Sequence, residues 1–216
     1  MTEYALEYDK FLLSMKAFEV NFEKPYVLSS ELKLPLYCDN RLIFSHSSVF
    51  VYAIHALKEM ITTYFPNVQV IAGVSTAGIP HGAVLAYLLQ LPFVYIRANP
   101  KGYGQGKQIE GVIHPGQNVL IIEDLIFKGV ASMQAVESVK AAGGNVIGIA
   151  ALFTYGLNSV EEMFVQNNVL VHTISHMLSL IETAYKTSYI TEDQKQKLLE
   201  WHANPFIWKP ALAIAV

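Results

Sequence analysis

Short apolar runs alternate with segments of helical character along most of this chain, and this alternation restricts the fold more than any other feature. Five runs rich in Val and Ile are predicted as strands, at residues 68–74, 92–97, 118–124, 145–153 and 169–175. Helices are predicted between them at residues 78–90, 132–142 and 159–167. Strands that alternate with helices of this length predict an α/β fold, with a mainly parallel central sheet flanked by helices.

The segments on either side of this core differ from it. Helices are predicted at residues 4–17, 47–64, 176–186 and 191–202, and residues 26–40 form an extended, proline-containing segment. We expect that segment to form a small hood or hairpin over the sheet edge. A length of 216 residues suits a single domain. The expected domain covers residues 1–216, with a core at about 46–175 and a hood built from about 1–45 and the C-terminal helices.

The composition raises the question of a membrane protein, because 52% of the residues are hydrophobic and the mean hydropathy is +0.31. Residues 60–96 contain no Asp, Glu, Lys or Arg. That stretch is interrupted by Pro66, Gly73, Pro80 and Pro92, so it holds no continuous apolar window of about 20 residues. Buried parallel strands produce the same apolar runs. We therefore expect no membrane association.

Charge and cysteine content restrict the partners and the compartment. A net charge of −3 and a pI near 6.2 give no basic surface for nucleic acid. The single cysteine, Cys38, excludes an internal disulfide. The first ten residues carry three acids and no basic region typical of a secretory signal. These features predict a cytoplasmic protein.

Two adjacent acids, Glu123 and Asp124, end the predicted strand at residues 118–124, and a helix is predicted shortly after them. Ligands of open α/β sheets bind at the carboxyl ends of the strands. Adjacent carboxylates there accept hydrogen bonds from vicinal hydroxyls or help to position a divalent cation. The helix N-terminus favours an anion. This pattern indicates a site for a phosphorylated ribose, although the acids alone are equally consistent with a solvated strand end.

The same region resembles a known motif. NVLIIEDLIFKGVASMQAVESVKAAGGNVIGIAALFTYG is similar to the phosphoribosyl-pyrophosphate motif of type I phosphoribosyltransferases, specifically the orotate phosphoribosyltransferases. PYVLSSELKLPLYCDNR resembles their N-terminal hood, and GVSTAGIPHGAVLAYLLQLPFVYIR their pyrophosphate loop with its helix and next strand. RANPKGYGQGKQIEG resembles the flexible catalytic loop, and FTYGLNSVEE with the helices through EWHANP follows the bacterial form. Together these segments cover about residues 5–205.

The resemblance implies the type I phosphoribosyltransferase fold and a reaction. Orotate and 5-phosphoribosyl 1-pyrophosphate would give orotidine 5-monophosphate and pyrophosphate, a step in pyrimidine (UMP) biosynthesis. It also implies a Mg²⁺ cofactor held mainly by the substrate, with Asp124 as a possible contact and no metal site built from protein residues alone. A homodimer with shared active sites is expected, because the loop Lys101 enters the neighbouring subunit's site in this family.

The resemblance further assigns roles to residues of this chain. The implied catalytic residues are Lys101, Arg97 and Asp124. Glu123 and Asp124 would bind the ribose hydroxyls, and Tyr37 would cover the orotate ring. The remaining implied substrate contacts are the 5-phosphate turn of Lys128, Gly129, Val130, Ala131 and Ser132, the pyrophosphate loop of Ser75, Thr76, Ala77 and Gly78, and Tyr103 of the catalytic loop.

The functional loops depart from the family pattern at several positions. Lys128 replaces a threonine, Val130 a glycine and Ala131 a serine in the phosphate turn, and Tyr103 replaces a histidine in the catalytic loop. A β-branched valine resists positive φ, so the turn either takes ordinary backbone angles or is remodelled around Lys128. These departures leave two alternatives to an orotate enzyme: a phosphoribosyltransferase for another base, or a regulatory relative that binds nucleotides without catalysis.

Overall fold

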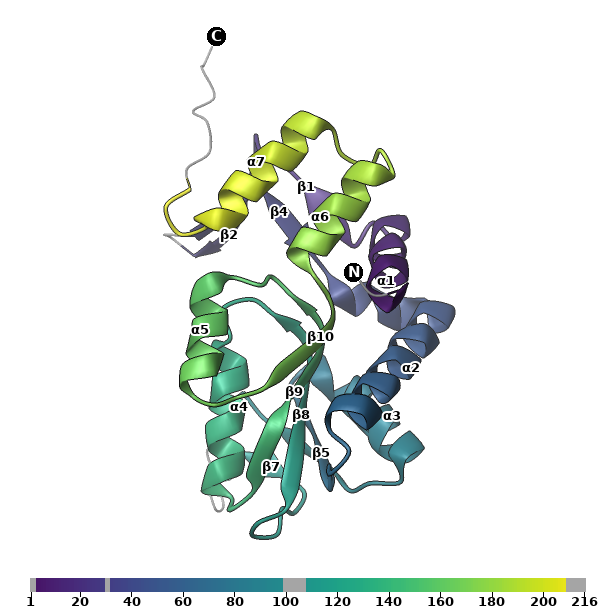
Figure 1. The fold of residues 1–216 in the computed structure, drawn as a ribbon, viewed down its shortest axis with the longest axis vertical. Coiled ribbons are helices and arrows are strands. Elements are labelled where there is room, and N and C mark those ends of the chain that lie inside the picture. Colours follow the sequence, from purple (N-terminus) through teal and green to yellow (C-terminus); the bar gives the residue numbers. More distant parts are fainter. Residues whose placement is uncertain (1–2, 30–31, 99–107, 209–216) are drawn as a thin grey trace.

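The computed structural model describes residues 3–29, 32–98 and 108–208, and its centre is one six-stranded sheet (Figure 1). The strands are β5 (Val70–Val74), β6 (Phe93–Ile96), β7 (Ile109–Glu110), β8 (Asn118–Ile126), β9 (Asn145–Thr154) and β10 (Val171–His176). They are arranged in the order β10-β9-β8-β5-β6-β7. All neighbours are parallel except β6 and β7. The predicted α/β class with a mainly parallel sheet is confirmed.

Helices cover both faces of this sheet. One face carries α2 (Ser47–Tyr64) and α3 (Gly78–Leu89), and the other carries α4 (Val130–Ala141) and α5 (Asn158–Gln166) (Figure 1). Every residue of β5 is buried as a result. The long apolar runs are therefore strands buried on both faces. Within the described part of the chain, the helices are too short or too polar to cross a bilayer.

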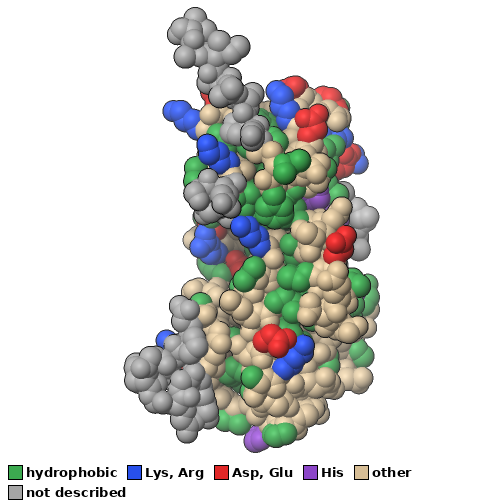
Figure 2. All heavy atoms as spheres, turned by 90° about the vertical axis from the view of Figure 1, so that its left-hand side faces the viewer, with side chains coloured by type: hydrophobic (Ala, Val, Ile, Leu, Met, Phe, Trp, Pro, Cys, Tyr) green, Lys and Arg blue, Asp and Glu red, His purple; other side chains and the backbone are tan. Residues whose placement is uncertain are grey.

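A hood of small sheets and helices stands over the carboxyl ends of the strands. Its sheets pair β1 (Phe18–Val20) with β4 (Leu36–Cys38) and β2 (Tyr26–Ser29) with β3 (Leu32–Leu34). Around them lie α1 (Glu3–Ser14), α6 (Met177–Lys186), α7 (Glu192–Ala203) and the 3-10 helix η1 (Asn40–Ser45). On the face shown in Figure 2, charged side chains gather on this hood and are sparse over α4 and α5.

A buried carboxylate ties the two ends of the chain together within the hood. Asp9 of α1 is fully buried and accepts hydrogen bonds from the hydroxyls of Ser175, Ser179 and Thr183. Three donors offset the desolvation of this carboxylate, which burial would otherwise make unfavourable. The first helix is thereby fixed to β10 and α6, so the hood contains both termini of the described chain.

The structure differs from the predicted element boundaries at two places near the acid pair. Strand β8 runs two residues further than predicted, because Leu125 and Ile126 continue the parallel pairing with Phe153 and Thr154 of β9. Helix α4 begins at Val130, two residues before the predicted start. The acids Glu123 and Asp124 therefore lie inside the strand and not at its end, and the turn that follows the strand is short.

Candidate active site

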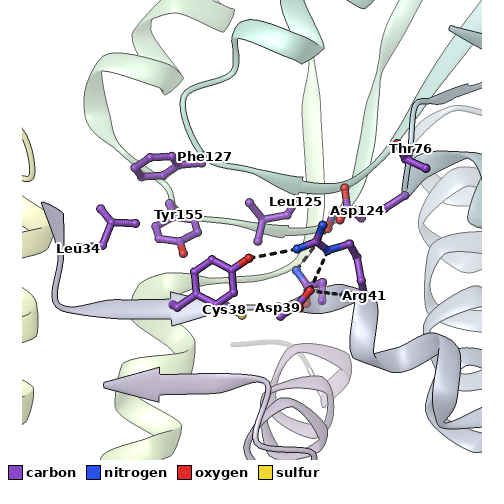
Figure 3. A pocket seen from close by; sticks show the side chains of 12 residues that line it. Leu34, Cys38, Asp39, Arg41, Thr76, Asp124, Leu125, Phe127 and Tyr155 are labelled. Carbon is purple, nitrogen blue, oxygen red and sulfur yellow. Dashed lines mark hydrogen bonds and ion pairs between the residues drawn. The ribbon is translucent and has the colours of Figure 1, made fainter. Parts of the chain in front are cut away.

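A cavity of about 280 Å³ opens between the hood and the carboxyl ends of the sheet (Figure 3). Three parts of the chain meet there: the hood strands with η1, the loop after β5, and the ends of β8 and β9. In Figure 3, Leu34, Phe127 and Tyr155 lie at one end of the cavity, and Arg41, Asp124 and Thr76 lie at the other. The lining residues are Leu34, Tyr37, Cys38, Asp39, Asn40, Arg41, Thr76, Ala77, Asp124, Leu125, Phe127 and Tyr155.

The two adjacent acids point to opposite faces of the sheet, since successive side chains alternate along a strand. Asp124 lines the cavity below the hood. Glu123 lies on the other face, where its Oε1 accepts a hydrogen bond of 2.9 Å from Ser132 Oγ of α4. A ligand in the cavity thus meets Asp124, whereas Glu123 is enclosed between β8 and α4 in this structure.

Enclosure changes the ionisation of Glu123. Its side chain is 5% exposed, and burial raises its pKa to about 8 despite the hydrogen bond from Ser132. The neighbouring Asp124 charge raises this pKa further. A pKa of about 8 favours the protonated acid at neutral pH, and this group contacts Ser132 in the first turn of α4.

This shift predicts a stability that depends on pH. Because the folded pKa is above the usual value, the contribution of Glu123 is complete below about pH 4.5 and is lost as the pH rises through about 8. At about 1.36 kcal/mol per pKa unit, the loss approaches roughly 5 kcal/mol across the shift from 4.5 to about 8. Glu123→Gln removes the titration, so we expect its free energy of unfolding to fall much less than that of the wild type between pH 6 and 9. Urea unfolding at several pH values measures this difference, and parallel curves would contradict it.

Asp124 lies in a polar part of the same cavity. Burial raises its pKa, while backbone N–H groups at Leu125 and Asp124 and the charge of Arg41 act in the opposite direction. The side-chain amide of Asn40 donates to the backbone carbonyl of Asp124 at 3.4 Å. This contact joins the hood to the end of β8 and holds the Asp124 backbone beneath η1.

The turn between β8 and α4 contains the predicted 5-phosphate residues. Gly129 adopts φ of +69°, and a side chain there would also meet Met163 of α5 at 2.5 Å. Val130 is the first residue of α4 and takes ordinary helical angles. Helix α4 has no side-chain cap at its N-terminus. The turn thus keeps one glycine where positive φ is needed, and the N–H groups of the first turn remain available to an anion.

The side chains of this turn contribute little polar chemistry. Val130 and Ala131 are exposed, and the Ser132 hydroxyl is engaged with Glu123. Lys128 is exposed, with its Nζ 5.9 Å from the centre of the Phe206 ring. Lys128 therefore lies toward the C-terminal segment in this structure, and the anion-binding capacity of the turn resides in backbone amides.

The loop after β5 forms another wall of the cavity. Thr76 and Ala77 line it, and the peptide between Ser75 and Thr76 is cis. Gly78 begins α3 so close to β8 that a Cβ atom there would lie 2.3 Å from the carbonyl oxygen of Ile122. His81 is buried, and its Nδ1 donates to the Ala77 carbonyl at 2.7 Å. These contacts fix the loop directly against the strand that carries Asp124.

The remaining predicted residues lie outside the cavity or outside the described chain. Arg97 follows β6, and its Nη1 lies 3.4 Å from Glu110 Oε1. The amide of Gln108 donates to the Arg97 carbonyl at 2.8 Å. Lys101 and Tyr103 fall within residues 99–107, which the structure does not describe.

Comparison with known proteins identifies the family. A model of the phosphoribosyl transferase domain matches residues 43–174. An orotate phosphoribosyltransferase of Listeria innocua is 42% identical over 197 residues, which cover 91% of this chain and 94% of that protein. The orotate phosphoribosyltransferase of Bacillus caldolyticus is 43% identical, covering 91% of this chain and 95% of its own length. The chain belongs to the orotate phosphoribosyltransferase family.

Solved structures agree on the fold of this chain. The orotate phosphoribosyltransferase of Aeropyrum pernix superimposes with a TM-score of 0.73 at 24% identity, covering 85% of this chain and 99% of that one. The UMP synthase of Leishmania donovani gives a TM-score of 0.77 at 20% identity, covering 91% of this chain and 42% of that one. These structures confirm the type I fold that the resemblance implied. The relatives of 42% and 43% identity confirm the phosphoribosyltransferase class.

Several residues that line the cavity were not predicted from the sequence. Arg41 and Asp39 come from the end of the hood segment, and Phe127 and Tyr155 from the ends of β8 and β9. The signal available for Arg41 was a basic residue at the end of a segment expected to cover an anionic base. The predicted Tyr37 does line the cavity, and its hydroxyl accepts a hydrogen bond of 3.1 Å from Arg41 Nη2.

Proposed function

We propose that this protein transfers the phosphoribosyl group of 5-phosphoribosyl 1-pyrophosphate to orotate within the cavity under the hood. The observation that carries the proposal is that Asp124, the loop residues Thr76 and Ala77, and Tyr37 of the hood line a single cavity. The pyrophosphate would lie against the loop, the ribose at Asp124 and the base under Tyr37. Pyrophosphate, ribose and base would then lie along the loop after β5, the end of β8 and the hood, in that order.

The 5-phosphate would bind at the N-terminus of α4. The free N–H groups of Val130, Ala131 and Ser132 are suited to this role, and the helix dipole adds to it. The side chains of Val130 and Ala131 offer no hydrogen bonds. Gly129 allows the positive φ that turns the chain into the helix. Lys128 would leave Phe206 to approach the phosphate as a point charge.

Bond exchange at the ribose requires little covalent chemistry from the protein. The bond from ribose C1 to pyrophosphate breaks with its electron pair on the departing oxygen, and the electron pair of deprotonated orotate N1 forms the new bond. Asp124 would hold the ribose hydroxyls and stabilise positive charge on the ring. Arg97 and Lys101 would offset the negative charge on the pyrophosphate. To do so, Arg97 would give up its ion pair with Glu110 and pair with the pyrophosphate.

A Mg²⁺ ion forms part of the proposal, held mainly by substrate oxygens. Among the described residues, no group of three His, Cys, Asp or Glu side chains is arranged for a metal. Of the two acids that line the cavity, Asp39 is paired with Arg41, which leaves Asp124 as the carboxylate suited to the ion. When bound, the ion would neutralise pyrophosphate charge.

We further propose that the enzyme acts in the cytoplasm, where its one cysteine, buried Cys38, stays reduced.

The test is pyrophosphate release from phosphoribosyl pyrophosphate and magnesium, with orotate, uracil, hypoxanthine and adenine supplied separately. We expect release with orotate alone. Release only with another base would support a phosphoribosyltransferase for that base. If no base led to pyrophosphate release but a ribose phosphate bound measurably, the result would support a regulatory relative that binds nucleotides without catalysis.

The proposed dimer with shared sites makes a separate prediction. Lys101→Ala and Asp124→Asn should each inactivate the enzyme, and mixing the two variants under conditions that exchange subunits should restore activity. Half of the dimers would be mixed, and one site in each would combine an intact Asp124 with the partner's intact Lys101. The expected recovery is about one quarter of the wild-type rate. No recovery in a mixture shown to contain mixed dimers would mean that Lys101 acts within its own subunit.

A further inference from the structure

Arg41 is held in place by two neighbouring side chains of the hood. Its Nε donates to Asp39 Oδ1 at 2.9 Å, and its Nη2 donates to the Tyr37 hydroxyl at 3.1 Å. A guanidinium group has five N–H donors, so these two bonds leave three. Figure 3 shows the group directed into the cavity beside Asp124. Asp39 and Tyr37 therefore orient the planar guanidinium group of Arg41. Its remaining N–H donors face the space in which a substrate would lie.

The charges around the cavity make Arg41 decisive for an anionic ligand. Among the described lining residues, Arg41 is the one cationic side chain, while Asp39 and Asp124 are acids. An anion brought here without Arg41 would face two carboxylates. With Arg41 it meets a fork whose geometry matches a carboxylate.

The chemistry of orotate indicates which group meets this fork. The carboxylate of orotate is attached to C6, next to the N1 atom that bonds to ribose C1. A carboxylate in that position must lie close to the ribose. Arg41 lies at the junction required, beside the ribose-binding candidate Asp124 on one side and bonded to Tyr37 of the hood on the other.

We propose that Arg41 is the specificity-determining residue for the base, because it binds the C6 carboxylate of orotate. This assignment rests on the proposed function and deepens it. Uracil has the same ring without the carboxylate, so binding uracil would leave the Arg41 donors without the partner they are oriented for. The discrimination between orotate and uracil therefore arises in the hood, not in the strand that carries the acid pair.

The sharpest test replaces Arg41 by glutamine and compares both substrates and both nucleotide products. Arg41→Gln is expected to lower kcat/KM for orotate about 10- to 100-fold, the effect of one charged hydrogen-bonding partner. The KM for phosphoribosyl pyrophosphate should change by less than about threefold. Calorimetry should show that the preference for orotidine 5-monophosphate over uridine 5-monophosphate falls by the same 10- to 100-fold factor, because these nucleotides differ only in the carboxylate.

Two further variants test whether the guanidinium geometry or the positive charge alone causes the preference for orotate. Arg41→Lys keeps the charge but loses the fork, so it should recover only part of the preference. Lys33→Gln removes one positive charge from an exposed position on β3 of the hood, away from the cavity, and should behave as the wild type. Equal loss in Lys33→Gln and Arg41→Gln would overturn the proposal, since it would indicate general electrostatic attraction.

The outcomes separate this inference from the proposed function. Normal turnover with an unchanged nucleotide preference in Arg41→Gln would overturn the inference and leave the function intact. Suppose that the protein turns over no base but binds orotidine 5-monophosphate in preference to uridine 5-monophosphate, and that this preference depends on Arg41. That result would support the inference and overturn the function. A raised KM for phosphoribosyl pyrophosphate with an unchanged nucleotide preference would assign Arg41 to the pyrophosphate and overturn the inference.

Discussion

Replacing Asp124 by asparagine is expected to lower kcat about 1000-fold without unfolding the protein. Asparagine has the same shape but no charge, so it cannot stabilise positive charge on the ribose ring. It also replaces one of the two acceptor oxygens by an NH2 donor, so the two ribose hydroxyls cannot each donate to an oxygen of their own. Loss of one well-placed electrostatic partner typically costs about 100- to 1000-fold in rate. Burial already raises the pKa of Asp124, which means that its environment disfavours the charged form. The neutral variant should therefore be at least as stable as the wild type.

Single-turnover kinetics with saturating substrates measures the chemical step, and thermal unfolding reports the stability. Asp193→Asn is a suitable control, because Asp193 is an exposed acid of α7 in an ion pair with Lys197, outside the cavity. It should leave kcat unchanged. If Asp124→Asn retained more than about a tenth of the wild-type kcat, Asp124 would have no large part in the reaction.

Replacing Gly78 by alanine is expected to cost about 3 kcal/mol of stability and to abolish binding of phosphoribosyl pyrophosphate. The added Cβ would lie 2.3 Å from the Ile122 carbonyl oxygen and 3.5 Å from the Glu123 Cα, both backbone atoms of β8. Backbone atoms in a central strand cannot rotate away as a side chain does. Helix α3 and β8 would have to separate, which disturbs packing throughout this part of the core. The loop residue Thr76 would then move away from Asp124.

Urea unfolding and calorimetric titration with phosphoribosyl pyrophosphate test the two parts of this prediction. Gly116→Ala provides a matched control, because Gly116 also has a special backbone, with φ of +78°, but a Cβ there meets nothing within 4 Å. Its cost is the conformational strain alone, about 1 to 2 kcal/mol. A loss in Gly78→Ala no larger than that of Gly116→Ala would show that β8 and α3 adapt to the extra atom.

The core of the fold could be predicted because its signals are local. Each predicted strand is a run of aliphatic residues, and burial on both faces is the only arrangement that removes such a run from water. The signals were weaker at the ends of elements. Leu125 and Ile126 were not assigned to β8, because their place in the strand depends on β9, whose residues lie far away in the sequence.

The candidate site was predicted less completely than the fold. The adjacency of Glu123 and Asp124 suggested one ligand for both, but strand geometry directs neighbouring side chains to opposite faces. Ser132 then engages Glu123, a contact between a strand and the helix that packs on it. Val130 resembled a disruption of the phosphate turn. It is accommodated because the positive φ falls on Gly129 and Val130 is already helical.

The α/β class, the acid pair near the carboxyl end of a strand, the hood and the family were predictable from the sequence alone. These depend on residues close together in the chain and on motifs in a fixed order. The structure was needed to show that Asp124 and not Glu123 faces the cavity, that burial raises the pKa of Glu123 to about 8, and that Arg41 lies beside Asp124. The hood reaches the end of β8 through a contact such as that of Asn40 with Asp124, 84 residues apart. Folding alone brings such groups together, and no local pattern records their distance.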